Sequence, residues 1–163
     1  MTSDVTPSSE EALPPAPGDE AMAEFSARCS AIEEAYEFML AYAAQGLANE
    51  DGSVSGSQIR EFLRKCDAAL TGLGEALTHC VRRLDIRSLA PYDAFIGVVE
   101  RDVRSAQAAV QLVLAQRSIS SQLVDNLNAS IHLRAVLTDL FLLDDVLKCN
   151  STEPRPWPDA PRL

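Results

Sequence analysis

Apolar residues recur at alternating steps of three and four along most of this chain, and this spacing constrains its fold more than any other feature. In an α-helix, residues three and four apart lie on one face, so each run predicts a helix with one buried side. Four such runs follow one another: Asp19 to Leu47, Ser55 to Arg87, a run after Ser88 that reaches Val113, and a run after Ser118–Ser121 that reaches Leu147. The sequence therefore predicts an all-α protein, specifically an antiparallel four-helix bundle.

The expected core follows from these runs. The first helix should bury one line of side chains: Phe25, Cys29, Ile32, Tyr36, Met39 and Ala43. The third run is the most regular, with Tyr92, Ile96, Val99, Val103, Ala106, Val110 and Val113. The fourth should bury Leu123, Leu127, Ile131, Val136, Leu140, Leu143 and Leu147. Each line is expected to face a shared apolar interior.

Local signals predict where the helices begin and where they weaken. Ser55 followed by Gln58 has the spacing of a capping box, in which side chains satisfy the free amides of a first turn. The hydroxyls of Ser118–Ser121 can cap the fourth helix in the same way. Gly72 and Gly74 each weaken the second helix by up to about 1 kcal/mol relative to alanine, and their missing side chains allow another helix to approach.

The two ends of the chain differ in composition from the four runs. Residues 1–18 are acidic and rich in Pro and Ser, which predicts a disordered leader, and residues 150–163 contain four prolines, which predicts an extended Pro-rich tail. Residues 19–149 are then the bundle, in a chain of 163 residues that suits one domain. The leader lacks the basic start and apolar run of a secretory signal, so a cytoplasmic protein is expected. The alternative is a secreted bacterial effector without a classical signal peptide.

Charge and cysteine placement exclude several classes of function. The formal net charge of −10 argues against a nucleic-acid surface, because phosphate binding depends on Lys and Arg. No apolar stretch is long enough to predict a membrane span. Cys29, Cys66 and Cys80 fall on apolar faces, where a free thiol behaves as a small hydrophobe. A reduced protein with no metal and no cofactor is expected.

The segment from Asn49 to Leu63 reads NEDGSVSGSQIREFL. It resembles the second half of an EF-hand calcium loop and its exit helix; the matching positions are Asn49, Asp51, Gly52 and Val54. The first loop position holds Leu47, where that family supplies a carboxylate, and Gln58 replaces the bidentate Glu of the twelfth. Few anionic ligands remain for Ca²⁺, so a turn followed by a helix start is expected here.

Two sets of polar residues share helical faces. Glu75 and His79 lie four apart, as a solvated pair or as two ligands of a metal would. Asp125, His132 and Asp139 recur every seven residues. A solvated face is the ordinary reading of such a stripe, and a buried proton-handling network is the alternative.

Three arginines, Arg82, Arg83 and Arg87, gather at the corner between the second and third helices. Such a corner binds anions in some proteins, because free amides and guanidinium groups attract phosphate and carboxylate. Basic residues also complement the negative end of a helix dipole, which is the commoner role.

The second half of the fourth helix, VLTDLFLLDDVL, is apolar on nearly every side. Phe141, Leu142 and Val146 are therefore candidate partner-binding residues, together with Trp157 between two prolines of the tail. No catalytic constellation is present, so the sequence predicts a non-enzymatic interaction protein: an assembly chaperone, an adaptor, an accessory subunit or a self-associating bundle.

The alternative function is a small-molecule or cofactor binder, possibly an enzyme. Its pocket would lie between the helices, near Tyr36, Tyr92, Cys80 and one of the two histidines, His79 or His132.

Overall fold

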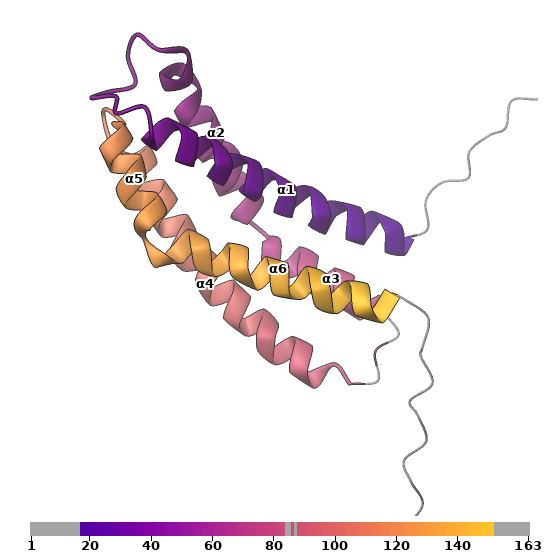
Figure 1. Ribbon diagram of the computed structural model, residues 1–163. Helices are drawn as coiled ribbons and strands as arrows, with labels where there is room; N and C mark the ends of the chain where they lie inside the picture. Colours follow the sequence, from indigo (N-terminus) through magenta and orange to yellow (C-terminus); the bar gives the residue numbers. More distant parts are fainter. Residues whose placement is uncertain (1–16, 84–85, 87, 152–163) are drawn as a thin grey trace, which may run out of the picture.

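The computed structural model describes residues 17–83, 86 and 88–151 (Figure 1). Within these residues all regular structure is helical, so the all-α class is confirmed. The helices are α1 (Pro17–Ala43), α2 (Val54–Leu70), α3 (Leu73–Arg82), α4 (Ala90–Leu114), α5 (Ser121–Ala129) and α6 (Ile131–Ser151). No helix in the described part of the chain combines the length and hydropathy needed to cross a membrane. Residues 1–16 of the predicted leader and 152–163 of the predicted tail lie outside the described residues.

Helices α1 and α4 follow the apolar spacing closely. In α4, every predicted core residue from Ile96 to Val113 is buried, because the steps of three and four are kept without interruption. In α1, Phe25, Ile32 and Met39 are buried as predicted. Ala35 and Tyr42 are also fully buried although the pattern did not select them. A long helix that contacts neighbours on two sides buries more than one line of side chains.

The predicted second helix is wrong as a single element, because the chain breaks at Thr71 and Gly72. Thr71 has an extended backbone, and Gly72 has a φ of +75°, which favours glycine. The break leaves the last carbonyls of α2 without helical partners. Arg28 of α1 satisfies some of them: its guanidinium donates to the backbone oxygens of Ala69, at 3.4 Å, and of Thr71.

The predicted fourth helix is also divided, into α5 and α6, with extended backbone at Ser130. The break changes which residues face inward. Ile131, predicted as core, is 68% exposed, whereas Leu133 and Leu137 of α6 are buried.

Serine side chains cap the starts of α2 and α5. Ser120 caps α5 as predicted, accepting a hydrogen bond from the amide of Leu123 at 3.1 Å. The capping box predicted at Ser55 is wrong: the cap of α2 is Ser53, whose hydroxyl accepts from the amide of Gly56 at 2.9 Å. Ser55 lies inside the helix and donates to the side chain of Gln45.

The helices pack around one apolar core (Figure 1). Helix α1 lies against α2, α3 and α5, and α4 lies against α2, α3 and α6. By contrast, α1 and α6 touch only sparsely. The edge between α1 and α6 is therefore the least closely packed side of the core.

At the α5 end, a set of hydrogen bonds holds α1 to the segment that leads into α5; we call its residues, Tyr42, Leu47, Ile119 and Ser121, the closed end. The Tyr42 hydroxyl donates to the Ile119 carbonyl at 2.7 Å, and the Ser121 hydroxyl donates to the Tyr42 carbonyl at 2.6 Å. The Leu47 amide donates to the Ser121 hydroxyl at 3.0 Å, and the Ser121 amide donates to the Leu47 carbonyl at 2.9 Å. Buried hydroxyls are thus fully used here.

Candidate functional site: grooves beside α6

The second half of α6 exposes adjacent large apolar residues. Phe141 is 56% exposed and Leu142 is 52% exposed, while Leu140, Leu143 and Leu147 on the inner face are buried. Phe141 and Leu142 are consecutive, so they point about 100° apart around the helix axis. Each of them consequently lines a different groove, one on either side of α6.

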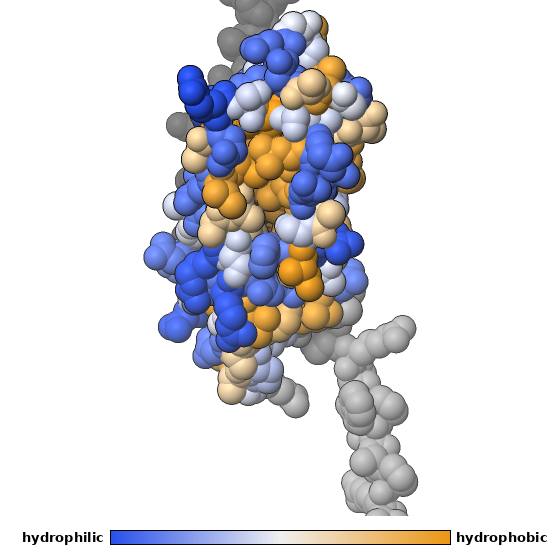
Figure 2. All heavy atoms as spheres, turned by 90° about the vertical axis from the view of Figure 1, so that its left-hand side faces the viewer, coloured by the Kyte–Doolittle hydropathy of each residue, from blue (hydrophilic) through white to orange (hydrophobic). Residues whose placement is uncertain are grey.

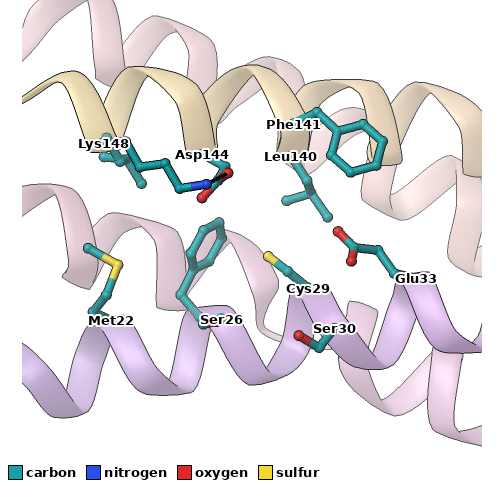
Figure 3. Close-up of a pocket in the computed structure, with 11 residues that line it drawn as sticks. Met22, Ser26, Cys29, Ser30, Glu33, Leu140, Phe141, Asp144 and Lys148 are labelled. Carbon is teal, nitrogen blue, oxygen red and sulfur yellow. Dashed lines mark hydrogen bonds and ion pairs between the residues drawn. The ribbon is translucent and has the colours of Figure 1, made fainter.

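The first is the α1–α6 groove, with a volume of about 610 Å³. Its lining comes from α1 (Met22, Phe25, Ser26, Cys29, Ser30 and Glu33) and from α6 (Leu140, Phe141, Asp144, Leu147 and Lys148). In Figure 3, Cys29 and Glu33 of α1 and Leu140 and Asp144 of α6 point into the space between the two helices. Apolar and sulfur-containing side chains lie within the groove, and charged groups lie among them.

Of the two carboxylates that line the α1–α6 groove, one is paired with a cation among the described residues and one is not. Asp144 accepts a hydrogen bond from Lys148, four residues later on α6. Glu33 is half-buried, and within the described part of the chain it forms no ion pair and accepts no hydrogen bond. In Figure 3 the carboxylates of both Glu33 and Asp144 point toward the space between the helices. The groove therefore presents one neutralised carboxylate and one that lacks a cation.

Cys29 lines the same groove but is not an activated thiol. Burial, and after it the nearby carboxylates of Glu33 and Asp144, raise the pKa of the Cys29 thiol to about 12. Since the thiolate is the reactive form, Cys29 is a poor nucleophile at neutral pH. Burial likewise raises the pKa of Cys66 to about 12 and raises that of Cys80, whose thiol lies 3.5 Å from the sulfur of Met22.

The second, the α4–α6 groove, is smaller, at about 260 Å³, and almost entirely apolar. It lies between the start of α4 and the second half of α6, and its lining is Pro91, Tyr92, Phe95, Leu142, Leu143 and Val146. Two of the three candidate residues of α6, Leu142 and Val146, thus line one groove and Phe141 lines the other. The fourth candidate, Trp157, lies outside the described residues.

Other exposed apolar residues lie away from these grooves. Leu112 of α4 is 67% exposed, and Ile131 at the start of α6 is 68% exposed. Figure 2 shows the side of the molecule on which α5 lies, with apolar surface in the centre and hydrophilic side chains around it. Single exposed apolar residues are ordinary on protein surfaces, so these positions serve mainly as comparisons for Phe141 and Leu142.

The polar stripe predicted on one helix is divided by the break at Ser130. Asp125 lies on α5 and is exposed, and His132 lies on α6 and is exposed, as a solvated face requires. Asp139 differs, because it is half-buried and faces Asp102 of α4. Burial raises the pKa of the Asp139 carboxyl, and the negative charge of Asp102 raises it further.

The arginine corner is only partly described. Arg82 and Arg83 are exposed at the end of α3, where their charge complements the negative end of that helix dipole. Arg87 lies outside the described residues. The anion site predicted from all three arginines stays a prediction.

The EF-hand-like segment is a turn that leads into α2. The side chain of Asn49 accepts a hydrogen bond from the amide of Asp51 at 3.1 Å, and Gly52 has a φ of +80°. Glu50, between Asn49 and Asp51, forms an ion pair with Arg60 at 2.6 Å. No group of three or more metal-binding side chains occurs within the described residues.

The pocket residues proposed for a small-molecule binder are dispersed. Tyr92 lines the α4–α6 groove, Cys80 is buried beside Met22, and His79 and His132 are exposed. Glu75, the neighbour of His79 on α3, is exposed as well. Of the residues named for that pocket, including Tyr36, only Tyr92 lines either groove.

The sequence did not select Glu33 or Asp144 as site residues. A usable signal exists on α1: Glu33 follows Cys29 by four residues and Phe25 by eight, so it shares their helical face. A charged residue on an otherwise apolar helical face indicates that part of this face is exposed to solvent. Asp144 carries the same signal on α6, because it follows Leu140 by four residues and precedes Leu147 by three.

Comparisons with models of protein families, with curated proteins and with solved structures find no match to this chain.

Proposed function

We propose that the protein is a non-enzymatic interaction module that binds a protein partner along the second half of α6. The observation that carries this proposal is the exposure of Phe141 and Leu142 at two grooves on either side of one helix. Covering two half-exposed side chains of this size would stabilise a complex by about 2 to 3 kcal/mol. Roles as an assembly chaperone, adaptor or accessory subunit, in the cytoplasm, are consistent with such a surface.

We also infer that the six helices form an antiparallel four-helix bundle in which two of the four members are bent. Helices α2 and α3 would together form one member, and α5 and α6 another. The packing of α1 on α2 and α3, and of α4 on both α3 and α6, supports this arrangement. The bundle would then present the second half of its last member to a partner.

Photo-crosslinking in cells that naturally produce the protein tests the proposed function. A photoreactive amino acid is placed at Phe141 in one variant and at Leu112, the comparison site on α4, in another. We expect position 141 to form a covalent adduct with one defined protein and position 112 to form none. Equal adducts at both positions, or none at 141, would contradict the proposal. An adduct of the chain with itself would replace the protein partner with a second copy.

A further inference from the structure

The α1–α6 groove differs from the α4–α6 groove in its charge. Both grooves have apolar linings, but only the α1–α6 groove contains carboxylates, from Glu33 and Asp144. Asp144 is paired with Lys148, whereas Glu33 has no cation among the described residues. A half-buried carboxylate without a partner is costly to desolvate, so any apolar occupant of this groove is favoured if it brings a positive charge.

The wider surroundings of the groove point to the same charge. Between Asp19 and Leu47 the chain has six acidic residues and one basic residue, and the protein as a whole carries a formal net charge of −10. The negative field within the groove also acts on Cys29, whose thiol pKa is raised by Glu33 and Asp144 after the larger effect of burial. A basic occupant would be attracted before contact as well as in the complex.

The shape of the groove suits a helix. Its α1 side runs from Met22 to Glu33, which is about 17 Å at 1.5 Å per residue, and its α6 side runs from Leu140 to Lys148, about 12 Å. These lengths correspond to two to three turns of a third helix lying along the groove with its apolar side chains turned into it. A helix with apolar residues at positions i, i+3 or i+4 and i+7 would place them along the partly exposed apolar side chains of the lining, Met22, Cys29 and Phe141.

We propose that the α1–α6 groove binds an amphipathic helix of a partner protein that carries a Lys or Arg beside its apolar face, with Glu33 as the main acceptor of that charge. This inference rests on the proposed function and specifies the chemistry of the partner. The apolar side chains supply most of the affinity, and the pairing with Glu33 selects basic helices over acidic ones.

The test uses two synthetic helical peptides and the full chain. The peptides are about 14 residues long and share one apolar face, but their flanking residues are Lys in one and Glu in the other. Binding is measured by fluorescence anisotropy at 150 mM salt, which screens long-range attraction. We expect the Lys peptide to bind at least about fivefold more tightly than the Glu peptide. A photoreactive group in the Lys peptide should crosslink to residues of the α1–α6 groove.

Two double variants provide a matched control. Glu33→Gln with Asp144→Asn removes both groove carboxylates. Glu34→Gln with Asp145→Asn removes the carboxylate of the next residue on each helix and changes the net charge by the same amount. Glu34 and Asp145 are exposed and line neither groove. The first variant should bind the Lys peptide about fivefold more weakly than the parent protein does. The second should bind it with an affinity within about twofold of the parent's.

Several outcomes would overturn the inference. Equal binding of the two peptides, equal weakening by the two double variants, or crosslinks outside the groove would each show that the groove does not select a basic helix. If Trp157→Ala in the full chain strengthened peptide binding, the occupant would be the chain's own C-terminal segment. Self-association lost in the Glu33 and Asp144 variant would make the occupant a second copy. If position 141 still crosslinks a protein when the peptides fail, the proposed function stands and only this inference falls.

Discussion

One carboxylate joins three segments that are far apart in the sequence. Glu50 forms an ion pair with Arg60 of α2 at 2.6 Å and also accepts the amide of Ile119 at 2.8 Å. The Arg60 guanidinium donates in turn to the carbonyls of Leu114, at 3.0 Å, and Gln116, at 2.8 Å, at the end of α4. Both side chains are largely buried, and all of these bonds are charge-assisted.

Arg60→Met is therefore expected to lower the free energy of unfolding by about 2 to 4 kcal/mol, because it leaves the Glu50 charge and two carbonyls without their donor. Urea denaturation followed by circular dichroism measures the change. Lys65→Met is the control, since the Lys65–Glu61 pair is exposed, and it should cost at most about 1 kcal/mol. Equal losses in the two variants would show that the Glu50–Arg60 pair has no special role.

The residues that hold the molecule together at this scale were the hardest to predict. Tyr42 was not selected as core, although it is fully buried and donates to Ile119. Glu50 lies in the segment that was predicted as a turn, and no role was predicted for its carboxylate. Their partners are between 10 and 77 residues away, and helical spacing carries no information about such distant contacts.

At the scale of single helices, the role of a glycine depends on what surrounds it. Gly56 lies in the first turn of α2, and a Cβ there would lie 1.9 Å from the carbonyl oxygen of Glu50. Gly97, within α4, has no atom near the position of its missing Cβ. The first glycine permits a close turn, whereas the second only weakens its helix.

Substitution of these two glycines should have opposite effects. Gly56→Ala should destabilise the protein by about 2 to 4 kcal/mol, because backbone atoms must move to relieve the overlap. Gly97→Ala should stabilise it by up to about 1 kcal/mol through helix propensity alone. Thermal unfolding of both variants measures the difference. A Gly56→Ala variant as stable as the parent would contradict the close packing of this turn.

A second expectation concerns the contact between α4 and α6. The pKa of Asp139 is raised in the folded protein by burial and by Asp102, so the folded state binds this proton more tightly than the unfolded state. The contribution of Asp139 to stability is therefore lost as pH rises from the unfolded pKa, 3.8, through the folded value. Below 3.8 it is fully present.

Asp139→Asn should accordingly raise the free energy of unfolding at pH 7 by a fraction of a kcal/mol, up to about 1. The gain over the parent protein should shrink as the pH falls toward 4. Denaturation at a series of pH values measures it, with Asp125→Asn, at an exposed site on α5, as the control. A loss of stability at pH 7 would show that the Asp139 carboxylate has a favourable role instead.

A helix was predicted well where its own sequence determines its bounds, and poorly where contacts with other elements determine them. Helix α4 was predicted almost residue by residue, because its apolar steps are unbroken and its ends are marked by Pro91 and a polar turn. The break between α2 and α3 was visible only as a weakness at Gly72, since Arg28 of another helix completes it. The break at Ser130 has no glycine or proline, so the apolar spacing predicted one continuous helix there. Ile131 was therefore predicted as core, although it is exposed.

At the scale of the whole molecule, the exposed residues of α6 are separate from the bonds that maintain the fold. The sequence correctly indicated that this half of the helix is apolar on several sides, and Phe141, Leu142 and Val146 do line grooves. It could not indicate that the grooves differ in charge, because the carboxylate without a cation among the described residues, Glu33, comes from α1, whereas the α4 residues that line the other groove are uncharged.

Phe141→Ser combined with Leu142→Ser should therefore abolish partner crosslinking from position 146 while lowering the free energy of unfolding by only about 2 to 3 kcal/mol, because about half of each side chain is already covered in the free protein. Chemical denaturation and photo-crosslinking of the same preparations measure the two quantities. Leu140→Ser, at a buried neighbour on α6, is the contrasting variant and should destabilise the fold by several kcal/mol. A double variant that unfolds would assign Phe141 and Leu142 to the core.

The closed end also helps to set the width of the α1–α6 groove. Tyr42 is anchored there, and Met22, at the far end of the groove, is 20 residues or about 30 Å away along α1. Between these two positions Arg28 donates to the carbonyls of Ala69 and Thr71, so α1 is also held near the groove by the break between α2 and α3. Two separate attachments of one helix thus fix how far apart α1 and α6 stand.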